Sequence, residues 1–411
     1  MKLLLINQPL HNRGDESAHK GLLRSLLKLI PDVSIDVVIY DDDWDTINQF
    51  AVVDKRVHYH NFQPRILPTR FFSIVKYAVQ YNWNFLYHFY ADLKRISQFY
   101  KDADYVICAP GGISMGGFQN IEHLYALYYA KHFNKPLAYF GRSFGPFPTD
   151  TAKQKTYKEL SEKILNYFSF LSIRDKQTEL LAQQMGLKYV STVDSAFLDA
   201  PKVDIPNSVQ EQISNKYIVF VPNVLIWHYN YRNRISYDDV ISYFSRMANI
   251  LIKKYPAHKI VLLPQTFNYK DKLRDDINFF NELKKNVASS EIVVLSDQFS
   301  SDLQQTIISK AACVVGARYH SIVFSLNNNT PFVALSYEHK ITGLLEALGK
   351  QECMLDIVHA MDNQANVDAS LLKFKMLLDN LKKDENVMKN AKAIAEDGLS
   401  LLIEDIKDKL K

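Results

Sequence analysis

Short apolar runs alternate with helix-like stretches along the first half of the chain. Residues 2–6 form an apolar run of strand length, and four leucines between residues 22 and 27 recur at helical spacing. A second apolar run follows at residues 35–40. Strand, helix and strand in this order are typical of a parallel α/β sheet. The alternation continues to about residue 200, with strands expected at Tyr105–Ala109, Leu137–Phe140 and Phe170–Ile173, and helices at Ile121–His132, Ala152–Phe168 and Asp175–Met185.

A second series begins after a polar, proline-containing stretch at residues 199–216, where we expect the linker between two domains. Its expected strands are Tyr217–Val221, Lys259–Leu263, Glu291–Leu295, Cys313–Val315 and Phe332–Leu335. Its expected helices lie near Tyr237–Lys254, Lys272–Lys285, Asp302–Ala311, Ser321–Leu326 and Ile341–Leu348.

These two series predict an α/β protein with two Rossmann-like domains facing a cleft. We expect an N-terminal domain at residues 1–200 and a C-terminal domain at residues 217–365. Residues 366–411, which are amphipathic and rich in charge, predict a C-terminal helical tail. Because ligands of open α/β sheets bind beyond the carboxyl ends of the strands, the site is expected in the cleft.

The segment from about residue 60 to residue 100 interrupts the alternation. Nine aromatic residues lie between Phe71 and Tyr90, and five basic residues flank them. The pattern is typical of two structures: a helical subdomain whose aromatic residues form its core, or a surface that meets an acceptor molecule or a membrane interface. We interpret the segment as an insertion on the acceptor side of the N-terminal domain.

Composition excludes several classes of protein. The chain has 411 residues, of which 47% are hydrophobic and 23% charged, as in ordinary globular domains. A net charge of +4 gives no support for a nucleic-acid partner. The three cysteines have no paired spacing, so we expect no disulfide framework, no zinc site and a reducing, cytoplasmic compartment. No leader-like start and no apolar run of 18 residues occur, so neither a signal peptide nor a spanning helix is expected.

Two glycine motifs follow strands expected in the first domain. In residues 12–16, Asp15 either caps the next helix or, with Asn12 and Glu16, lines the cleft near a sugar hydroxyl. In residues 110–117, four glycines allow backbone amides to approach a ligand, with Gly111 and Gly112 lining the cleft; the alternative is a bare turn. No Lys-Ser or Lys-Thr pair follows, so this second motif is not a P-loop.

Basic side chains follow other expected strands. Arg142 and Ser143 lie in the motif at residues 141–147, and Arg174 ends the strand after it. A guanidinium at Arg174 would either form a fork with a carboxylate or phosphate in the cleft, or pair structurally with the next residue, Asp175.

In the second domain, basic residues also follow two neighbouring expected strands. Arg318 and His320 share one strand-to-helix loop, and Lys340 follows the next strand. Because adjacent parallel strands end side by side, we expect His320 and Lys340 to share a pocket, in which a helix N-terminus also favours an anion.

Together, and in this order, these motifs resemble those of the polysaccharide pyruvyl transferase family. The matching segments are Asn12–Glu16, Gly111–Gly117, Gly141–Phe147, Ile173–Asp175, Asp194–Phe197, Gly316–His320 and Ser336–Lys340. One departure is Arg142, which stands where the family usually has glutamine. The resemblance implies a fold like that of GT-B glycosyltransferases, with phosphoenolpyruvate as donor and a pyruvate ketal as product. It also implies a donor site lined by Arg174, Arg318, His320 and Lys340, to which we add Ser143.

Phosphoenolpyruvate carries about three negative charges at neutral pH, which the cations of this site would match. His320 is the expected acid for the methylene carbon, with Lys340 either sharing the proton transfer or holding the phosphate. The expected acceptor is a sugar of a surface polysaccharide, such as a capsule or exopolysaccharide, or its lipid-linked precursor. No cofactor and no metal are expected, and the protein is expected either free in the cytoplasm or peripheral on the inner face of the membrane. The alternative is a GT-B-type nucleotide-sugar glycosyltransferase, in which Arg318 and Lys340 would bind a diphosphate.

Overall fold

The fold is described from a computed structural model, which covers residues 1–7, 10, 12–39, 44–61, 68–82, 90–110, 115–116, 119–267 and 275–411. The chain divides into two compact units. Unit 1 comprises Met1–Leu10, Ala18–Asp199 and Ala393–Lys411, and unit 2 comprises His11–Ser17 and Ala200–Lys392. Within the described ranges, no helix is both long and apolar enough to cross a membrane.

Unit 1 is built on a seven-stranded parallel sheet in the order β3-β2-β1-β4-β5-β6-β7. Its strands are β1 (Lys2–Ile6), β2 (Ser34–Ile39), β3 (Val57–Asn61), β4 (Tyr105–Cys108), β5 (Leu137–Arg142), β6 (Phe170–Ile173) and β7 (Val190–Ser191). Its helices are α1 (Arg13–Leu29, whose first turn belongs to unit 2), α2 (Trp44–Phe50), α3 (Pro68–Tyr81), α4 (Ala91–Asp102), α5 (Ile121–His132), α6 (Ala152–Leu165), α7 (Lys176–Gln184) and the 3₁₀ helix η2 (Ser195–Leu198).

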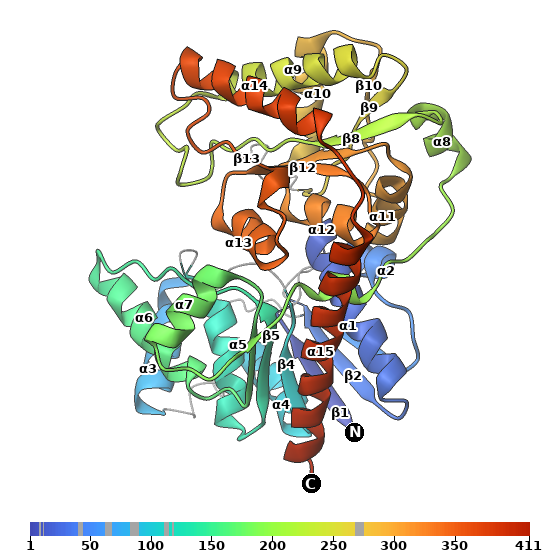
Figure 1. The fold of residues 1–411 in the computed structure, drawn as a ribbon. Helices are drawn as coiled ribbons and strands as arrows, with labels where there is room; N and C mark the ends of the chain where they lie inside the picture. Colours follow the sequence, from blue (N-terminus) through green and yellow to red (C-terminus); the bar gives the residue numbers. More distant parts are fainter. Residues whose placement is uncertain are drawn as a thin grey trace. The chain divides into compact units, whose positions relative to one another are not determined.

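The side chains of β1 alternate between the two faces of the sheet, and both faces are apolar, which explains why helices cover both. Leu3 and Leu5 belong to one apolar cluster, and Leu4 and Ile6 belong to the cluster on the opposite face, because successive side chains of a strand point to opposite faces. The end of α15 (Glu385–Lys409) covers the first face beside α1 (Figure 1). Its Asp405 accepts a hydrogen bond of 2.5 Å from the hydroxyl of Tyr105.

Unit 2 is built on a six-stranded parallel sheet in the order β10-β9-β8-β11-β12-β13. Its strands are β8 (Tyr217–Val221), β9 (Lys259–Leu262), β10 (Ile292–Val294), β11 (Val314–Gly316), β12 (Phe332–Ser336) and β13 (Met354–Asp356). Its helices are α8 (Asn207–Ile213), α9 (Tyr237–Lys254), α10 (Asp276–Val287), α11 (Ser301–Lys310), α12 (Tyr319–Asn327), α13 (His339–Ala347), the 3₁₀ helix η4 (Gln351–Cys353) and α14 (Gln364–Asp379).

Two parallel sheets with helices on their faces confirm the predicted α/β class with two Rossmann-like units. The division between the units falls between Asp199 and Ala200. The residues predicted as a helical tail form α14 and α15; α14 lies in unit 2, and residues from Ala393 onward lie in unit 1.

Candidate functional site

The carboxyl ends of β11 and β12 carry the predicted basic residues of unit 2. The two strands pair in parallel, with Gly316 opposite Ala334. Arg318 comes two residues after β11 and precedes the first turn of α12, and Lys340 is the second residue of α13 after β12. The topology therefore explains why two distant stretches of sequence supply cations to the same edge of one sheet.

A carboxylate fixes the guanidinium of Arg318. Its Nη2 donates to Oδ1 of Asp276, the first residue of α10. The other oxygen, Oδ2, accepts the backbone N–H groups of Gln265 (2.9 Å) and Thr266 (3.0 Å) after β9. Asp276 is thus tied to the backbone, and it orients Arg318 through a charge-assisted hydrogen bond.

Arg318 retains a donor that the described residues do not satisfy. Its Nε is buried and has no hydrogen-bond partner within the part of the chain that the structure describes. Burial lowers the pKa of Arg318, but the nearby Asp276, Tyr337 and Glu338 outweigh it, and the pKa is raised. A buried, charged N–H group without a partner is unfavourable, and a carboxylate or phosphate ligand would satisfy it.

His320 lies two residues further along, buried against the N-terminal glycine motif. A Cβ atom built on Gly14 would lie only 1.8 Å from Nδ1 of His320 and 2.1 Å from its Cγ. Ordinary contacts of a Cβ are 3.4–4 Å, so only glycine allows this approach. The first motif of the chain therefore forms the wall against which the imidazole of the fourth motif packs.

The rest of the first motif is held firmly in unit 2. Asn12 accepts the N–H of Gly14 at 2.8 Å through Oδ1 and donates to Oγ1 of Thr266 at 3.2 Å. Glu16 forms a fully buried ion pair with Arg13 at 2.8 Å. Its Oε1 also accepts the N–H of Ser301 at 3.0 Å and the Ser301 hydroxyl at 2.9 Å.

The predicted acceptor roles of Asn12, Asp15 and Glu16 stay predictions. The structure shows that the carboxylate of Glu16 joins the first turn of α1 to the start of α11, and that Asp15 is partly buried in that first turn. These contacts already give the motif a function, because they fix the backbone of Gly14 against His320.

A second ion pair holds Lys340. Its Nζ lies 3.4 Å from Oε2 of Glu338, and both side chains are largely buried. The neighbouring Tyr337 is buried, and burial together with Glu338 raises the pKa of its hydroxyl well above the usual value. Arg318 interacts electrostatically with both Tyr337 and Glu338, so the motifs after β11 and β12 form one site.

In unit 1, Arg174 is paired with a residue of a different motif. Its Nη1 donates to Asp194, and its Nε donates to Oγ of Ser143 at 3.4 Å. The Arg174 and Asp194 side chains are at most 2% exposed. Asp175 instead caps α7 by accepting the N–H of Thr178 at 2.9 Å. The pair expected as an alternative, Arg174 with Asp175, is thus replaced by Arg174 with Asp194, and a donor role for Arg174 and Ser143 stays a prediction.

Arg142 also makes buried contacts in unit 1. Its Nη1 donates to the carbonyl oxygens of Ala109 (2.6 Å) and Asn7 (3.2 Å), at the carboxyl ends of β4 and β1. It therefore supplies hydrogen bonds to two strand ends. Gly111 and Gly112, predicted to line the cleft, lie outside the described residues.

A cavity of about 200 Å³ lies beside the edge strand β3 in unit 1. Its lining residues are Val38, Tyr59, His60, Asn61, Arg95, Ile96 and Phe99. Nε2 of His60 donates to Oδ1 of Asp36 at 2.7 Å, and Arg95 donates to the carbonyl oxygen of Asn61 at 2.9 Å. Burial raises the pKa of Asp36, but hydrogen bonds from His60 and Lys2 outweigh this effect, and the pKa is lowered. The cavity thus combines an apolar floor with a guanidinium and an imidazole backed by a carboxylate.

The aromatic insertion is partly core. Phe71 and Tyr100 are buried in the apolar cluster that contains Leu4 and Ile6. Tyr77 and Tyr81 are 40% and 58% exposed, with ring centroids 5.9 Å apart. Residues 83–89, which carry four of its aromatic rings, lie outside the described ranges. Among the residues that are described, no three His, Cys, Asp or Glu side chains are grouped to hold a metal ion.

The model of one protein family matches residues 12–339, and that family is polysaccharide pyruvyl transferase. The matched range includes the motifs discussed above up to His339 and ends one residue before Lys340. The chain belongs to this family. It is accordingly a transferase enzyme of polysaccharide biosynthesis. One relative in this field is the amylovoran biosynthesis protein AmsJ of Erwinia amylovora, which is 24% identical over 95% of both chains.

Solved structures show how this family member is folded. The UDP-GlcNAc 2-epimerase of Methanocaldococcus jannaschii superimposes with a TM-score of 0.59 at 12% identity, covering 98% of this chain and 100% of that one. The UDP-GlcNAc 2-epimerase of Neisseria meningitidis, solved with UDP-GlcNAc, superimposes with a TM-score of 0.58 at 10% identity, covering 99% and 100%. These likenesses support the predicted GT-B-like fold and, at such identities, nothing beyond the fold.

Proposed function

We propose that this transferase moves the pyruvyl group of phosphoenolpyruvate onto a sugar of a surface polysaccharide or its lipid-linked precursor, and that it closes a pyruvate ketal. The observation that carries the proposal is the buried Nε of Arg318, a charged donor without a partner among the described residues, at the strand ends that also present Lys340. A small ligand with a carboxylate and a phosphate supplies acceptors for such donors.

Carboxylates oriented beside the cations make the site of unit 2 more selective for its ligand than free cations would be. Arg318 is paired with Asp276, and Lys340 with Glu338. Each pair uses only part of its cation's hydrogen-bonding capacity, since a guanidinium has five N–H donors and an ammonium three. The carboxylates therefore orient the cations, while the remaining N–H groups of Arg318 and Lys340 are the proposed contacts of the donor.

In the proposed reaction, His320 gives a proton to the methylene carbon, which becomes the methyl group, and the adjacent carbon becomes cation-like. A sugar hydroxyl then forms a bond to this carbon. The bond from the carbon to the phosphate oxygen breaks, phosphate leaves, and a second hydroxyl closes the ketal. Of the two hydroxyl protons released, one replaces the proton given by His320 and the other leaves with phosphate. N–H groups held at the phosphate stabilise its developing charge.

For the acceptor we propose the cavity of unit 1 beside β3. The hydrogen bond from Nε2 to the charged Asp36 leaves Nδ1 of His60 as an acceptor for a hydroxyl proton. Arg95 adds N–H donors, and the volume suits one sugar ring better than a large ligand, because drug-sized pockets are about 300–1,000 Å³. Contact of the aromatic insertion with a lipid-linked acceptor is part of the same proposal.

The choice of donor is tested by thermal unfolding of the intact chain with phosphoenolpyruvate or with a panel of nucleotide sugars. We expect stabilisation by phosphoenolpyruvate alone, of about 2.7 kcal/mol at 100 times its dissociation constant. Arg318→Ala is expected to abolish the shift. Stabilisation by a nucleotide sugar and none by phosphoenolpyruvate would instead establish the glycosyltransferase alternative.

A further inference from the structure

The carboxylate of Glu338 has an unusual place for a helix N-cap. Glu338 precedes α13 as its N-cap residue, yet its side chain makes no capping hydrogen bond. Side-chain oxygens at this position commonly accept an N–H of the first turn. The Glu338 carboxylate instead lies 3.4 Å from Nζ of Lys340 and 3.9 Å from Nε2 of His228, and it is 10% exposed. Local helix capping therefore does not explain its orientation.

The contacts of His228 fix which of its ring nitrogens carries the proton. Nδ1 accepts the backbone N–H of Asn230 at 3.3 Å, so the proton of the neutral ring is on Nε2. Burial lowers the pKa of His228 to about 4, and the opposing effect of Glu338 is smaller. At neutral pH an uncharged imidazole thus directs its N–H toward the carboxylate. The separation of 3.9 Å makes this an electrostatic contact rather than a direct hydrogen bond.

The ring is held rigidly by its neighbours. It packs edge-on against Tyr337, with centroids 5.2 Å apart, and lies 4.2 Å from the ring of Tyr229. The next residue, Asn230, donates from Nδ2 to the carbonyl oxygen of Tyr337 at 2.9 Å. The loop after β8 is thereby joined directly to the segment after β12 that carries Glu338.

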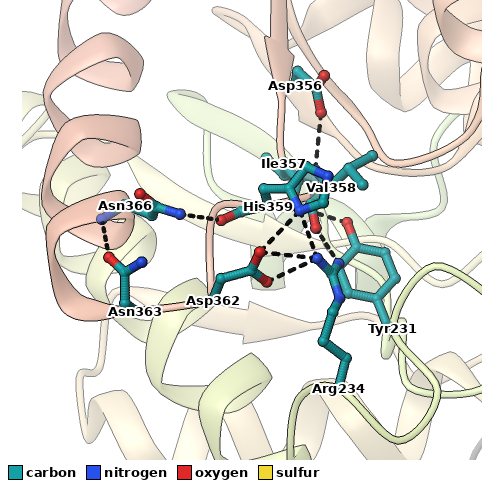
Figure 2. Close-up of polar contacts among 9 residues, drawn as sticks. All are labelled: Tyr231, Arg234, Asp356, Ile357, Val358, His359, Asp362, Asn363 and Asn366. Atoms are coloured by element: carbon teal, nitrogen blue, oxygen red, sulfur yellow. Dashed lines mark hydrogen bonds and ion pairs between the residues drawn. The ribbon is translucent and has the colours of Figure 1, made fainter.

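The far end of this loop is anchored to the segment after β13 (Figure 2). Tyr231 donates to the carbonyl oxygen of Ile357 at 2.9 Å. Arg234 contacts Asp362 at 2.8 Å and also donates to the carbonyl oxygen of Val358. With both ends fixed, His228 has little freedom to leave Glu338.

We infer that His228 and Glu338 are positioning residues for Lys340, holding its ammonium at the strand ends where the donor is proposed to bind. The expected change in kcat rests on the proposed function, whereas the expected change in how firmly Lys340 is held rests on the contacts alone. Glu338 also places a negative charge near an anionic donor. Its value to the enzyme must then lie in orienting Lys340 for the reaction, and not in the affinity for the donor.

The kinetic test separates turnover from binding in Glu338→Gln, which removes the charge and keeps the shape. We expect kcat to fall about tenfold or more, while the KM for phosphoenolpyruvate stays equal or falls. His228→Phe, which keeps the ring but has no N–H, is expected to behave similarly, and His228→Gln, which restores an N–H group, to recover most of kcat. Glu346→Gln, on the exposed face of the same helix, is the matched control. An unchanged kcat in Glu338→Gln, or a raised KM with kcat retained, would overturn the inference.

A second readout needs no turnover. The rate at which acetic anhydride acetylates Lys340 is measured by mass spectrometry, with Lys176, 57% exposed in unit 1, as the internal reference. We expect several-fold faster labelling of Lys340 in Glu338→Gln and His228→Phe, because the ammonium is no longer held. Equal labelling in all variants would refute the positioning role. If the wild-type protein does not turn over phosphoenolpyruvate but the labelling changes as expected, the proposed donor fails and the positioning role stands.

Discussion

The contact between Gly14 and His320 gives the sharpest structural prediction for catalysis. In Gly14→Ala the new methyl group would lie 1.8 Å from Nδ1 of His320, so the ring has to withdraw by about 1.6 Å to reach an ordinary contact of 3.4 Å. A misplacement of about 1 Å costs on the order of 100-fold in rate, and acid–base groups typically contribute about 100- to 10,000-fold. We therefore expect kcat to fall by about 100-fold.

The stability of Gly14→Ala should change much less than its activity. Overpacking costs about 1–3 kcal/mol, whereas alanine inside a helix such as α1 gains about 1 kcal/mol over glycine. The expected net loss is about 0–2 kcal/mol, measured by urea unfolding. The affinity for phosphoenolpyruvate should be retained, because Arg318 and Lys340 are not displaced.

The decisive assay is phosphate release in a double-mutant cycle of Gly14→Ala and His320→Ala. Once the imidazole is absent there is no ring to displace, so Gly14→Ala should have almost no further effect on kcat in the His320→Ala background. Leu29→Ala, at the exposed end of the same helix, controls for changes in α1 itself. An equal fall of kcat in both backgrounds, or no fall in either, would show that the contact between Gly14 and His320 does not control catalysis.

Three further predictions concern unit 1. Arg174→Ala should destabilise the protein by about 3–5 kcal/mol in urea, because it removes the guanidinium that is paired with the fully buried carboxylate of Asp194. Asp194→Ala added to it should recover part of the loss, and an unchanged midpoint would contradict this. Burial lowers the pKa of His19 to about 3, so the unfolded chain binds the extra proton below about pH 6.5. About 3 kcal/mol of stability should therefore be lost between pH 6.5 and pH 4, and His19→Gln should flatten this slope. Arg95→Ala or His60→Gln should raise the KM for the acceptor and leave phosphoenolpyruvate binding unchanged; equal effects on both would remove the acceptor from this cavity.

The central strands and the edge strand β10, expected at Glu291–Leu295, could be predicted from the sequence, whereas the edge strands β3, β7 and β13 could not. Val57–Asn61, which forms β3 at the edge of the first sheet, is mostly half-exposed and contains two histidines, so it lacks the apolar run by which β1 and β2 are recognised. The outer strands β7 and β13 have only two and three residues. An edge strand needs neither two apolar faces nor great length, so periodicity alone misses strands as exposed as β3 or as short and weakly patterned as β7 and β13.

The site residues that lie in local motifs could likewise be predicted from the sequence, whereas their partners from distant parts of the chain could not. Arg318 and Lys340 could be predicted together, because both follow strands and adjacent parallel strands end side by side. Their partners could not: Asp276 lies 42 residues before Arg318 in a stretch without a motif, and His228 lies 110 residues before Glu338. No local pattern encodes such pairs.

The partners change the physical interpretation of the site. The sequence suggests a pocket of unopposed positive charge, whereas the structure shows cations that carboxylates orient. Glycine at position 14 is a similar case. Its motif suggests a turn or a ligand loop, but the structure gives it a distant contact, the imidazole of His320.

The most direct test of the proposed donor site is phosphate release from phosphoenolpyruvate by the wild-type chain and by Arg318→Ala. It would be made with and without a panel of galactose-, mannose- and glucose-type acceptors on lipid-like aglycones, and the products would be examined by mass spectrometry. We expect release that depends on one acceptor, a product heavier than that acceptor by one pyruvyl ketal, and loss of both in Arg318→Ala. Acceptor-dependent release that Arg318→Ala leaves intact would contradict the proposed donor site, and glycosyl transfer from a nucleotide sugar with no reaction of phosphoenolpyruvate would contradict the proposed donor.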